Sequence, residues 1–229
     1  MLDFYKDHCK HYVAVDCIIF GFNKKKLKLL LIERNFEPGK GQWSLMGGFL
    51  EDKESLDEAA QRILKNLTGL KNIFLEQLLT YGDVKRDIAG RVVSVAYFAL
   101  INTEEFDDTN TKEYKASWFD LNELPPLIFD HCDMVDKALR RLRRKCKTQP
   151  IGFELLPAKF TIPQLMKLYA AIFEQEYDKR NFRKKILSYG ILKKLEEKDK
   201  MNSRKGAYYY QFENAKYDEL IRNGYLFEL

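Results

Sequence analysis

Apolar runs in the first hundred residues predict a set of β-strands. Val13–Phe22 and Leu27–Glu33 are rich in aliphatic and β-branched residues and are joined by a short polar turn, which predicts a β-hairpin. A second strand-rich stretch extends from residue 73 to residue 100, and its last part, Val92–Leu100, is apolar enough for a buried strand. The N-terminal part of the chain is therefore expected to contain a sheet.

Two helices are predicted in the same part of the chain. The first begins near Ser55, whose hydroxyl can cap the helix in a capping box, and it ends at Gly69. The second covers about residues 133–147 and ends in basic side chains, which favour the negative end of the helix dipole. Asp130 and His131 precede it and either cap it or line a pocket, and capping is the preferred interpretation.

The pattern changes after residue 150, where a second module is predicted. Thr161 caps a helix with apolar residues at helical spacing, and another helix follows over residues 178–190. In this later helix Phe182, Ile186 and Tyr189 fall on one side, whereas basic residues fall on the other. Two short strands around a basic, glycine-containing tip then complete the element order of a winged helix.

The basic excess of the chain lies mostly in this second module. The net charge is +5, and residues 151–229 carry 15 Lys and Arg against 11 Asp and Glu. Residues 179–205 hold 11 basic and 3 acidic side chains, the electrostatic footprint expected of a DNA-binding surface. The alternative interpretation is a solvated helical hairpin on an enzyme. The side chains expected to contact DNA are Lys179, Arg180, Asn181, Arg183, Lys184, Arg204 and Lys205.

Cysteine spacing and hydropathy indicate the compartment. The four cysteines lack the paired spacing of disulfide frameworks or zinc sites, which favours a reducing cytosol. No signal peptide opens the sequence, and the longest early apolar run is too short to span a bilayer. We therefore expect a cytoplasmic protein that has no membrane partner.

Residues 47–70 carry the most specific motif. A glycine loop leads into a predicted helix, and the spacing of its glycine, acidic and arginine positions is that of the Nudix signature. The residues in register with that signature are Gly48, Glu54, Arg62, Leu64, Gly69 and Leu70. The segment thus resembles the Nudix superfamily, and the resemblance implies a sandwich built on a mixed β-sheet.

Three positions depart from the signature, because Ile63, Asn66 and Leu67 stand where the superfamily has metal-binding glutamates. Such positions share one helix face, and Mg²⁺ requires hard oxygen ligands there. We therefore expect no metal, no cofactor and no catalytic residue, so that the cleft binds a small molecule without cleaving it. The expected effector-binding residues flank this ancestral cleft and are Arg34, Trp43, Met46, Phe49, Glu54, Arg62 and Tyr81.

Together the two modules resemble the Nudix-related transcriptional regulators over nearly the whole chain. The expected fold is an α-β-α Nudix-like sandwich of the α+β class with a mixed sheet, followed by a winged helix-turn-helix domain. The first domain is expected to be a catalytically inactive effector-binding unit over residues 1–150, and the second a DNA-binding unit over residues 151–229. A homodimer formed through the Nudix-like domain would place two basic helices on a palindromic operator.

Within that group, residues 16–22, 43–49 and 124–136 are most similar to the arabinose-responsive branch known from Bacteroides. This resemblance implies a regulator of pentose catabolism genes that binds operator DNA and senses a sugar effector, L-arabinose. Two alternatives remain open. The first is a regulator of NAD metabolism that senses ADP-ribose, and the second is a working Nudix-type pyrophosphohydrolase.

Overall fold

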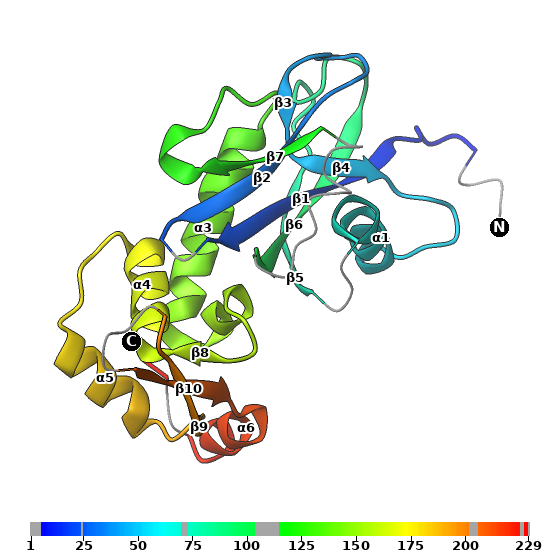
Figure 1. The fold of residues 1–229 in the computed structure, drawn as a ribbon. Helices are drawn as coiled ribbons and strands as arrows, with labels where there is room; N and C mark the ends of the chain where they lie inside the picture. The colour runs from blue at the N-terminus through cyan, green and yellow to red at the C-terminus, as the bar shows by residue number, and fades with distance from the viewer. Residues whose placement is uncertain are drawn as a thin grey trace.

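The computed structural model describes residues 6–23, 25–69, 73–103, 115–201, 206–224 and 227–228. Within these ranges a mixed sheet of seven strands forms the centre of the N-terminal part (Figure 1). Its strands are β1 (Tyr12–Phe22), β2 (Leu27–Glu33), β3 (Trp43–Ser44), β4 (Met46–Phe49), β5 (Phe74–Tyr81), β6 (Val92–Asn102) and β7 (Ala116–Asp120).

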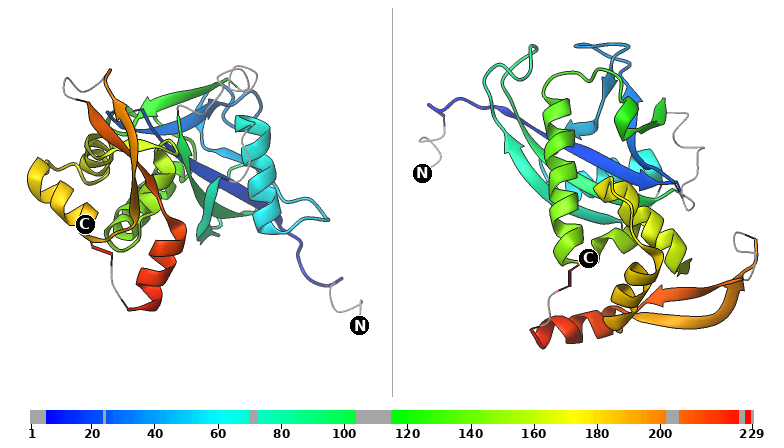
Figure 2. Two further views of the ribbon diagram at one scale, coloured as in Figure 1. Left: turned by 60° about the horizontal axis from the view of Figure 1, so that its bottom comes forward. Right: turned by 90° about the vertical axis from the view of Figure 1, so that its left-hand side faces the viewer.

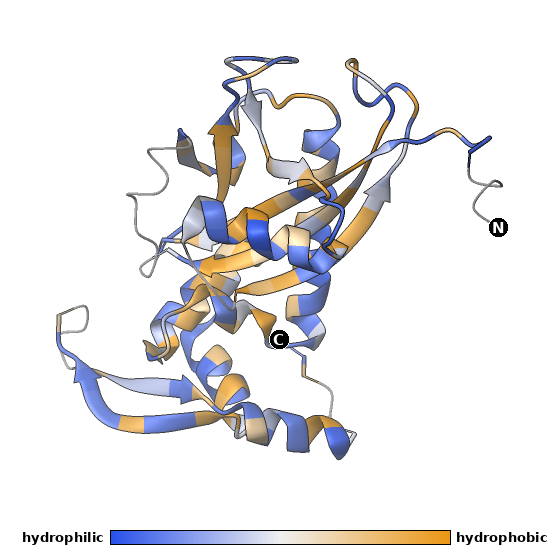
Figure 3. Cartoon of the chain, turned by 90° about the vertical axis from the view of Figure 1, so that its right-hand side faces the viewer, coloured by the Kyte–Doolittle hydropathy of each residue, from blue (hydrophilic) through white to orange (hydrophobic). Residues whose placement is uncertain are grey.

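The strand order confirms the predicted hairpin and the mixed sheet. The order is β3-β2-β1-β6-β5, with β4 paired to β1 and β7 paired to β2. Strands β1 and β2 are antiparallel, as predicted, whereas β1 and β6 run parallel over their full length. The central strands are mainly orange in Figure 3, which marks them as the most hydrophobic part of the chain.

Alternation along β1 divides the core into two layers. Val15, Cys17 and Ile19 face helix α1 (Leu56–Thr68), and all three are fully buried. Ile18 and Phe20 point to the opposite face and belong to the core that contains helix α3 (His131–Thr148). This separation follows from the two-residue period of a strand, and Figure 1 shows the sheet between the two helices.

The predicted ends of α1 are confirmed. The Ser55 hydroxyl accepts the Glu58 N–H, and the Glu58 carboxylate accepts the Ser55 N–H, which completes the capping box. Gly69 has a φ of 71°, the left-handed conformation that a helix C-cap requires and that glycine adopts without strain. These caps fix where the signature helix starts and stops.

The C-terminal elements have the predicted winged-helix order. A three-stranded sheet in the order β8-β10-β9 packs beside the helices, and its β9–β10 hairpin extends away from the body of the protein (Figure 2). The elements are η3 (Ile151–Leu155), β8 (Phe160–Thr161), α4 (Ile162–Phe173), α5 (Lys179–Ser188), β9 (Leu192–Asp199), β10 (Ala207–Phe212) and α6 (Asn214–Arg222).

Two features of the fold were not predicted. Helix α6 is short and contains no fully buried residue, although Tyr217 and Leu220 pack partly buried against the core. The two parts of the chain also share one apolar cluster, which runs from β1 through Leu142 and Cys146 of α3 to Leu168 and Tyr169 of α4. None of the described helices combines the length and apolar composition needed to cross a membrane.

Candidate effector cleft and DNA interface

A cleft of about 460 Å³ lies between the end of β2, the glycines of β4 and one face of α1. Its floor contains the Gly47 and Gly48 backbone, because glycine leaves the peptide groups uncovered by side chains. The other side chains that shape the cleft include Arg34, Phe36, Arg62, Ile63 and Asn66. The cleft therefore occupies the place that the Nudix signature predicts.

The face that would hold metal is apolar at its centre. Ile63 is 4% exposed and packs into the core beneath α1. A methyl group added at Gly48 would lie 3.4 Å from Ile63 Cδ1, so the isoleucine fills the space beside the loop. Asn66 offers an amide to the cleft, and the side chain of Leu67 lies outside the described part of the structure. Among the described residues, no group of three or more His, Cys, Asp or Glu is placed to hold a metal ion.

Arg62 ties the glycine-containing loop to α1. Its Nε and Nη2 donate to the two Glu54 carboxylate oxygens at 2.8 and 2.5 Å, and Nη2 also donates to the Phe49 carbonyl at 3.0 Å. The Glu51 N–H donates to the same carboxylate. The Arg62 guanidinium lowers the pKa of Glu54 to about 2, so both partners are charged near neutral pH. This ion pair holds the loop that forms the cleft floor.

Arg34 lies at the opposite rim. Its Nε donates to the Pro38 carbonyl at 2.8 Å, and its guanidinium carbon lies 4.1 Å from the centre of the Phe36 ring. The same carbon is 5.7 Å from the centre of the Phe129 ring, which lines a second cavity. Arg34 thus stands between the two cavities.

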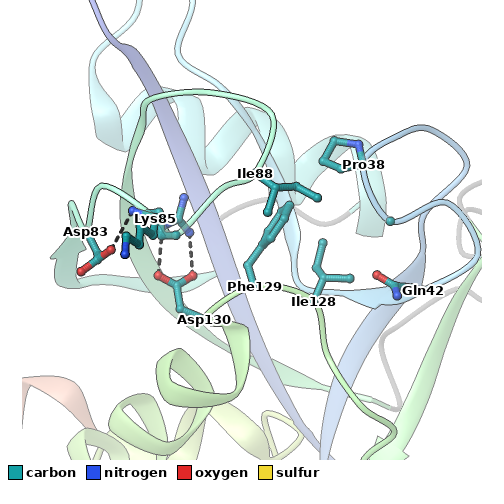
Figure 4. A pocket seen from close by; sticks show the side chains of 10 residues that line it. Pro38, Gln42, Asp83, Lys85, Ile88, Ile128, Phe129 and Asp130 are labelled. Atoms are coloured by element: carbon teal, nitrogen blue, oxygen red, sulfur yellow. Dashed lines mark hydrogen bonds and ion pairs between the residues drawn. The ribbon is translucent and has the colours of Figure 1, made fainter.

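The second cavity has a volume of about 480 Å³ and lies beside the N-terminal end of α3 (Figure 4). Asp130 lines it and accepts two hydrogen bonds from Arg86, at 2.9 Å from Nε and 2.8 Å from Nη2. Asp130 occupies the N-cap position but makes no capping hydrogen bond. The capping interpretation is therefore wrong for Asp130, because its carboxylate is engaged by a guanidinium instead.

His131 belongs to the same network and is buried. The Leu45 N–H donates to His131 Nδ1 at 3.1 Å, so the ring proton resides on Nε2, which lies 3.8 Å from Asp16 Oδ1. Burial lowers the pKa of His131, which keeps the ring neutral near pH 7. The sequence carried one signal for this network, since Asp16 interrupts an otherwise apolar strand.

The structure separates the seven expected effector residues into three groups. Arg34 and Arg62 line the cleft, and Glu54 and Phe49 hold Arg62 in place. Phe49 is otherwise exposed, and its ring packs on Tyr12 at 5.5 Å between centres. The remaining three belong to the core or pack against it and do not line the cleft: Trp43 against Phe119, Met46 beneath α1, and Tyr81 under Lys137 of α3.

Helix α5 presents the predicted basic face. Phe182 and Ile186 are buried against the domain, whereas Lys179, Arg180, Asn181 and Lys184 are exposed. The helix starts at Asp178, whose carboxylate accepts the Asn181 N–H at 2.8 Å. Exposed cationic side chains beside an asparagine can contact phosphates and base edges.

Arg183 has a different environment from the other basic residues of α5. Its Nη2 donates to the Tyr210 hydroxyl at 3.3 Å, so part of its donor capacity is used within the domain. This hydrogen bond joins α5 to β10, and Arg183 is otherwise exposed like its basic neighbours on the helix. Arg204 and Lys205, which were expected on the wing, lie outside the described residues.

The hairpin carries a cationic group that the sequence did not single out. Lys194 and Lys198 both lie against the ring of Tyr208, at 3.7 and 4.4 Å from its centre. The neighbouring Lys198 ammonium lowers the pKa of the Tyr208 hydroxyl. Since β9 and β10 pair in antiparallel register, these side chains gather on one face of the hairpin.

Comparison with known proteins assigns both modules. Residues 10–141 match the NUDIX domain family, and residues 152–212 match the NrtR DNA-binding winged helix domain. The chain is 32% identical over 216 residues to the ADPR responsive transcriptional repressor NtrR of Acinetobacter baylyi. That alignment covers 93% of this chain and 86% of the relative.

Solved structures agree with this assignment. The Shewanella oneidensis NrtR complexed with a 27mer DNA is similar with a TM-score of 0.82 and 27% identity, covering 94% of this chain and 97% of that one. The NUDIX domain of the same regulator complexed with ADP ribose is similar with a TM-score of 0.50 and 30% identity. That match covers 60% of this chain and 92% of the domain.

The comparisons give no support to the arabinose-responsive branch, because the relatives just named are described with ADP-ribose or DNA and none with a sugar. They do support the combination of a NUDIX domain and a DNA-binding winged helix in one chain. The chain belongs to the NrtR family of DNA-binding transcriptional regulators, in which a NUDIX domain precedes the winged helix.

Proposed function

We propose that this protein is a transcriptional repressor whose NUDIX domain binds ADP-ribose without hydrolysing it, and that the bound ligand weakens operator binding. The observation that carries the proposal is the cleft itself. It retains two arginines and an uncovered glycine backbone, while Ile63 and Asn66 replace carboxylates on the metal face. The named relatives support ADP-ribose over a free sugar as the effector.

The chemistry of the cleft suits a nucleoside diphosphate sugar. Guanidinium groups bind phosphate oxygens with paired, charge-assisted hydrogen bonds, and Arg34 and Arg62 both line the cleft. Arg62 is already paired with Glu54, so Arg34 is the principal candidate for a phosphate contact. Phe36 is 56% exposed at the rim, where an adenine base can stack on its ring beside the Arg34 guanidinium. A free pentose has neither the negative charge nor the flat base that these groups recognise.

The proposal that ADP-ribose is left intact is supported by the same face of α1. Nudix chemistry uses Mg²⁺ to shield the pyrophosphate and to activate the attacking water. An isoleucine supplies no ligand to Mg²⁺, and Asn66 is a neutral donor in place of a carboxylate. A sensor that leaves its effector intact can reach a binding equilibrium, which regulation requires.

Isothermal titration calorimetry tests the ligand. We expect ADP-ribose to bind, and L-arabinose and D-xylose to give no heat. Arg34→Ala should weaken ADP-ribose binding about tenfold or more, since a charge-assisted hydrogen bond contributes roughly 1.5–3 kcal/mol. Lys65→Ala is the matched control, because Lys65 is an exposed cation on α1 outside the cleft. Binding of a free pentose, with no binding of ADP-ribose, would overturn the proposal.

Fluorescence anisotropy tests the regulatory step. Labelled promoter fragments of NAD-metabolism genes and of pentose-catabolism genes are titrated with the protein, first alone and then with saturating ADP-ribose. We expect tight binding to the NAD-metabolism set only, and release when ADP-ribose is added. Specific binding to the pentose set, or an affinity that ADP-ribose does not change, would contradict the proposal. Product analysis after incubation with ADP-ribose and Mg²⁺ should recover intact ligand.

The assembly is part of the same proposal. A twofold dimer would present two copies of α5 to two half-sites spaced by a whole turn of DNA. Sedimentation equilibrium of the free protein should therefore give twice the mass of the 27.1 kDa chain. A monomer at micromolar concentration, or one protein chain per operator, would contradict the dimer.

A further inference from the structure

We propose that helix α3 couples the effector cleft to the winged helix, through a buried ionic network at its first turn and an arginine contact near its last turn. This inference rests on the proposed ADP-ribose function and specifies how that site controls DNA binding. The two ends of α3 are far apart, because 18 residues at ~1.5 Å each span roughly 27 Å. A direct contact between ligand and α5 is not needed if α3 carries the change.

The network at the first turn contains two carboxylates that share one guanidinium. Arg86 is 4% exposed and donates to Asp130 at 2.8 and 2.9 Å, and its Nη2 lies 3.6 Å from Asp16 Oδ2. The Ser94 hydroxyl also donates to Asp16, at 2.5 Å. A buried guanidinium is stable only while its charge partners stay in place. The position of Asp130, and with it the start of α3, is therefore linked to Asp16.

Asp16 in turn lies directly under the cleft floor. It is paired with Gly47 in the register of β1 and β4. A side chain on Gly47 would meet the Asp16 carboxylate, and it would come within 2.9 Å of the Val15 carbonyl oxygen. Close-packed protein interiors transmit the displacement of one group to the groups that it contacts. A ligand that moves the floor must therefore move Asp16 or change its ion pairs.

The second cavity gives the same network a direct route to the ligand. Lys85, Arg86 and Asp130 line this cavity (Figure 4). Arg34 lines the cleft and also lies against the Phe129 ring of this second cavity. An anionic group that enters it competes with Asp130 for the Arg86 guanidinium. Either route ends with a changed contact at Asp130, the N-cap residue of α3.

The last turns of α3 hold the end of α4. Arg143 Nε donates to the Ile172 carbonyl at 2.7 Å, and its Nη2 contacts the Glu174 carboxylate at 2.8 Å. Glu174 is the C-cap of α4 and has a φ of 53°, so the chain turns sharply there before α5 begins. Arg143 thus connects α3 to the segment that orients the helix with the exposed basic face.

Matched pairs of variants test whether α3 transmits the effect of ADP-ribose to the winged helix or only holds the two domains apart. Arg143→Met removes both contacts to α4 but keeps the apolar stem, and Arg144→Met alters its exposed neighbour on the same helix. Asp130→Asn weakens the Arg86 pair, and Asp136→Asn changes an exposed carboxylate two turns later. Glu174→Gln removes only the ionic part of the α4 contact at an exposed site, and therefore serves if Arg143→Met is unstable.

For each full-length variant, we measure the operator dissociation constant with saturating ADP-ribose and divide it by the constant measured without ADP-ribose. Allosteric ratios of about 5- to 150-fold are usual. We expect Arg143→Met, Glu174→Gln and Asp130→Asn to lower the ratio about 2- to 30-fold toward 1. Arg144→Met and Asp136→Asn should keep the wild-type ratio. Arg143→Met should bind ADP-ribose with wild-type affinity, which separates lost coupling from lost binding.

The possible failures are distinct. A wild-type ratio of 1 would overturn both the proposed function and this inference. A normal wild-type ratio that persists in folded Glu174→Gln and Asp130→Asn proteins would overturn the inference alone. Equal losses in the test variants and in their matched controls would also overturn it, since a nonspecific effect of α3 stability would then explain the data.

Discussion

Gly47 and Asp16 lie opposite each other on β4 and β1, and the buried Asp16 carboxylate leaves no room for a side chain on Gly47. Gly47→Ala should therefore shift backbone or carboxylate and cost about 1–3 kcal/mol of unfolding free energy, the usual penalty of overpacking. Thermal unfolding should show a lower Tm than wild type, and calorimetry should show weaker ADP-ribose binding.

Gly82→Ala is the control for this substitution, because a methyl group added at Gly82 meets no atom within 4 Å. Its free energy of unfolding should stay within the range of ordinary surface changes, about 0.5 kcal/mol in either direction. Equal stability of the two alanine variants would show that Gly47 is not in close contact with Asp16.

The ion pair between Glu54 and Arg62 predicts a pH dependence of stability. The pKa of Glu54 falls from 4.5 to about 2 on folding, so the pair stabilises the native state above about pH 4.5. This stabilisation is lost progressively as the pH falls from about 4.5 toward 2. The Tm difference between wild type and Glu54→Gln should therefore shrink across that interval. Asp52→Asn, in the same loop, should show no such change, and a pH-independent difference for Glu54→Gln would exclude the pair.

Restoring the signature should restore a metal site. In the triple variant Ile63→Glu, Asn66→Glu, Leu67→Glu, a carboxylate replaces the buried Ile63 side chain, so the metal-free protein should be less stable than wild type. Mg²⁺ should then raise its Tm by binding only the folded state, and should leave the wild-type Tm unchanged. Lys65→Glu controls for added charge on α1. A wild-type Tm that rises with Mg²⁺ would argue for a retained metal site.

The exposed basic face of α5 predicts the salt dependence of DNA binding. Arg180→Ala and Lys184→Ala should each weaken operator binding and reduce the slope of log K against log salt by about 0.9 if a phosphate contact is lost. Tyr210→Phe should act differently, because it removes only the acceptor of the Arg183 hydrogen bond. We expect it to weaken specific binding while the salt slope stays unchanged. Unaltered affinity in both α5 variants would remove this face from the interface.

Local sequence rules predicted the elements that depend on short-range chemistry. The hairpin of β1 and β2, the caps of α1 and α4, and the buried stripe of α5 each follow from residues within a few positions of one another. The signature likewise located the cleft, because loop and helix are contiguous in the chain. Phe182 and Ile186 were assigned to the buried side of α5 for the same reason.

Long-range contacts could not be predicted in the same way. The partners Arg86 and Asp130 are 44 residues apart, and nothing in their local sequence pairs them. Trp43, Met46 and Tyr81 flank the cleft in sequence, yet strand direction and register turn their side chains into the core or against it. The proposal of ADP-ribose as the effector also depended on the relatives. Arginine side chains in a cleft indicate a phosphate group, but they do not identify the rest of the ligand.

The apolar cluster that α3 and α4 share with the central sheet has a consequence for folding. Leu142, Cys146, Leu168 and Tyr169 are fully buried, and they belong to the same cluster as Phe20 and Leu29 of the sheet. Cutting the chain after α3 would expose these side chains on both fragments. The two modules should therefore unfold in one cooperative thermal transition. The winged helix should not fold stably when it is expressed without α3.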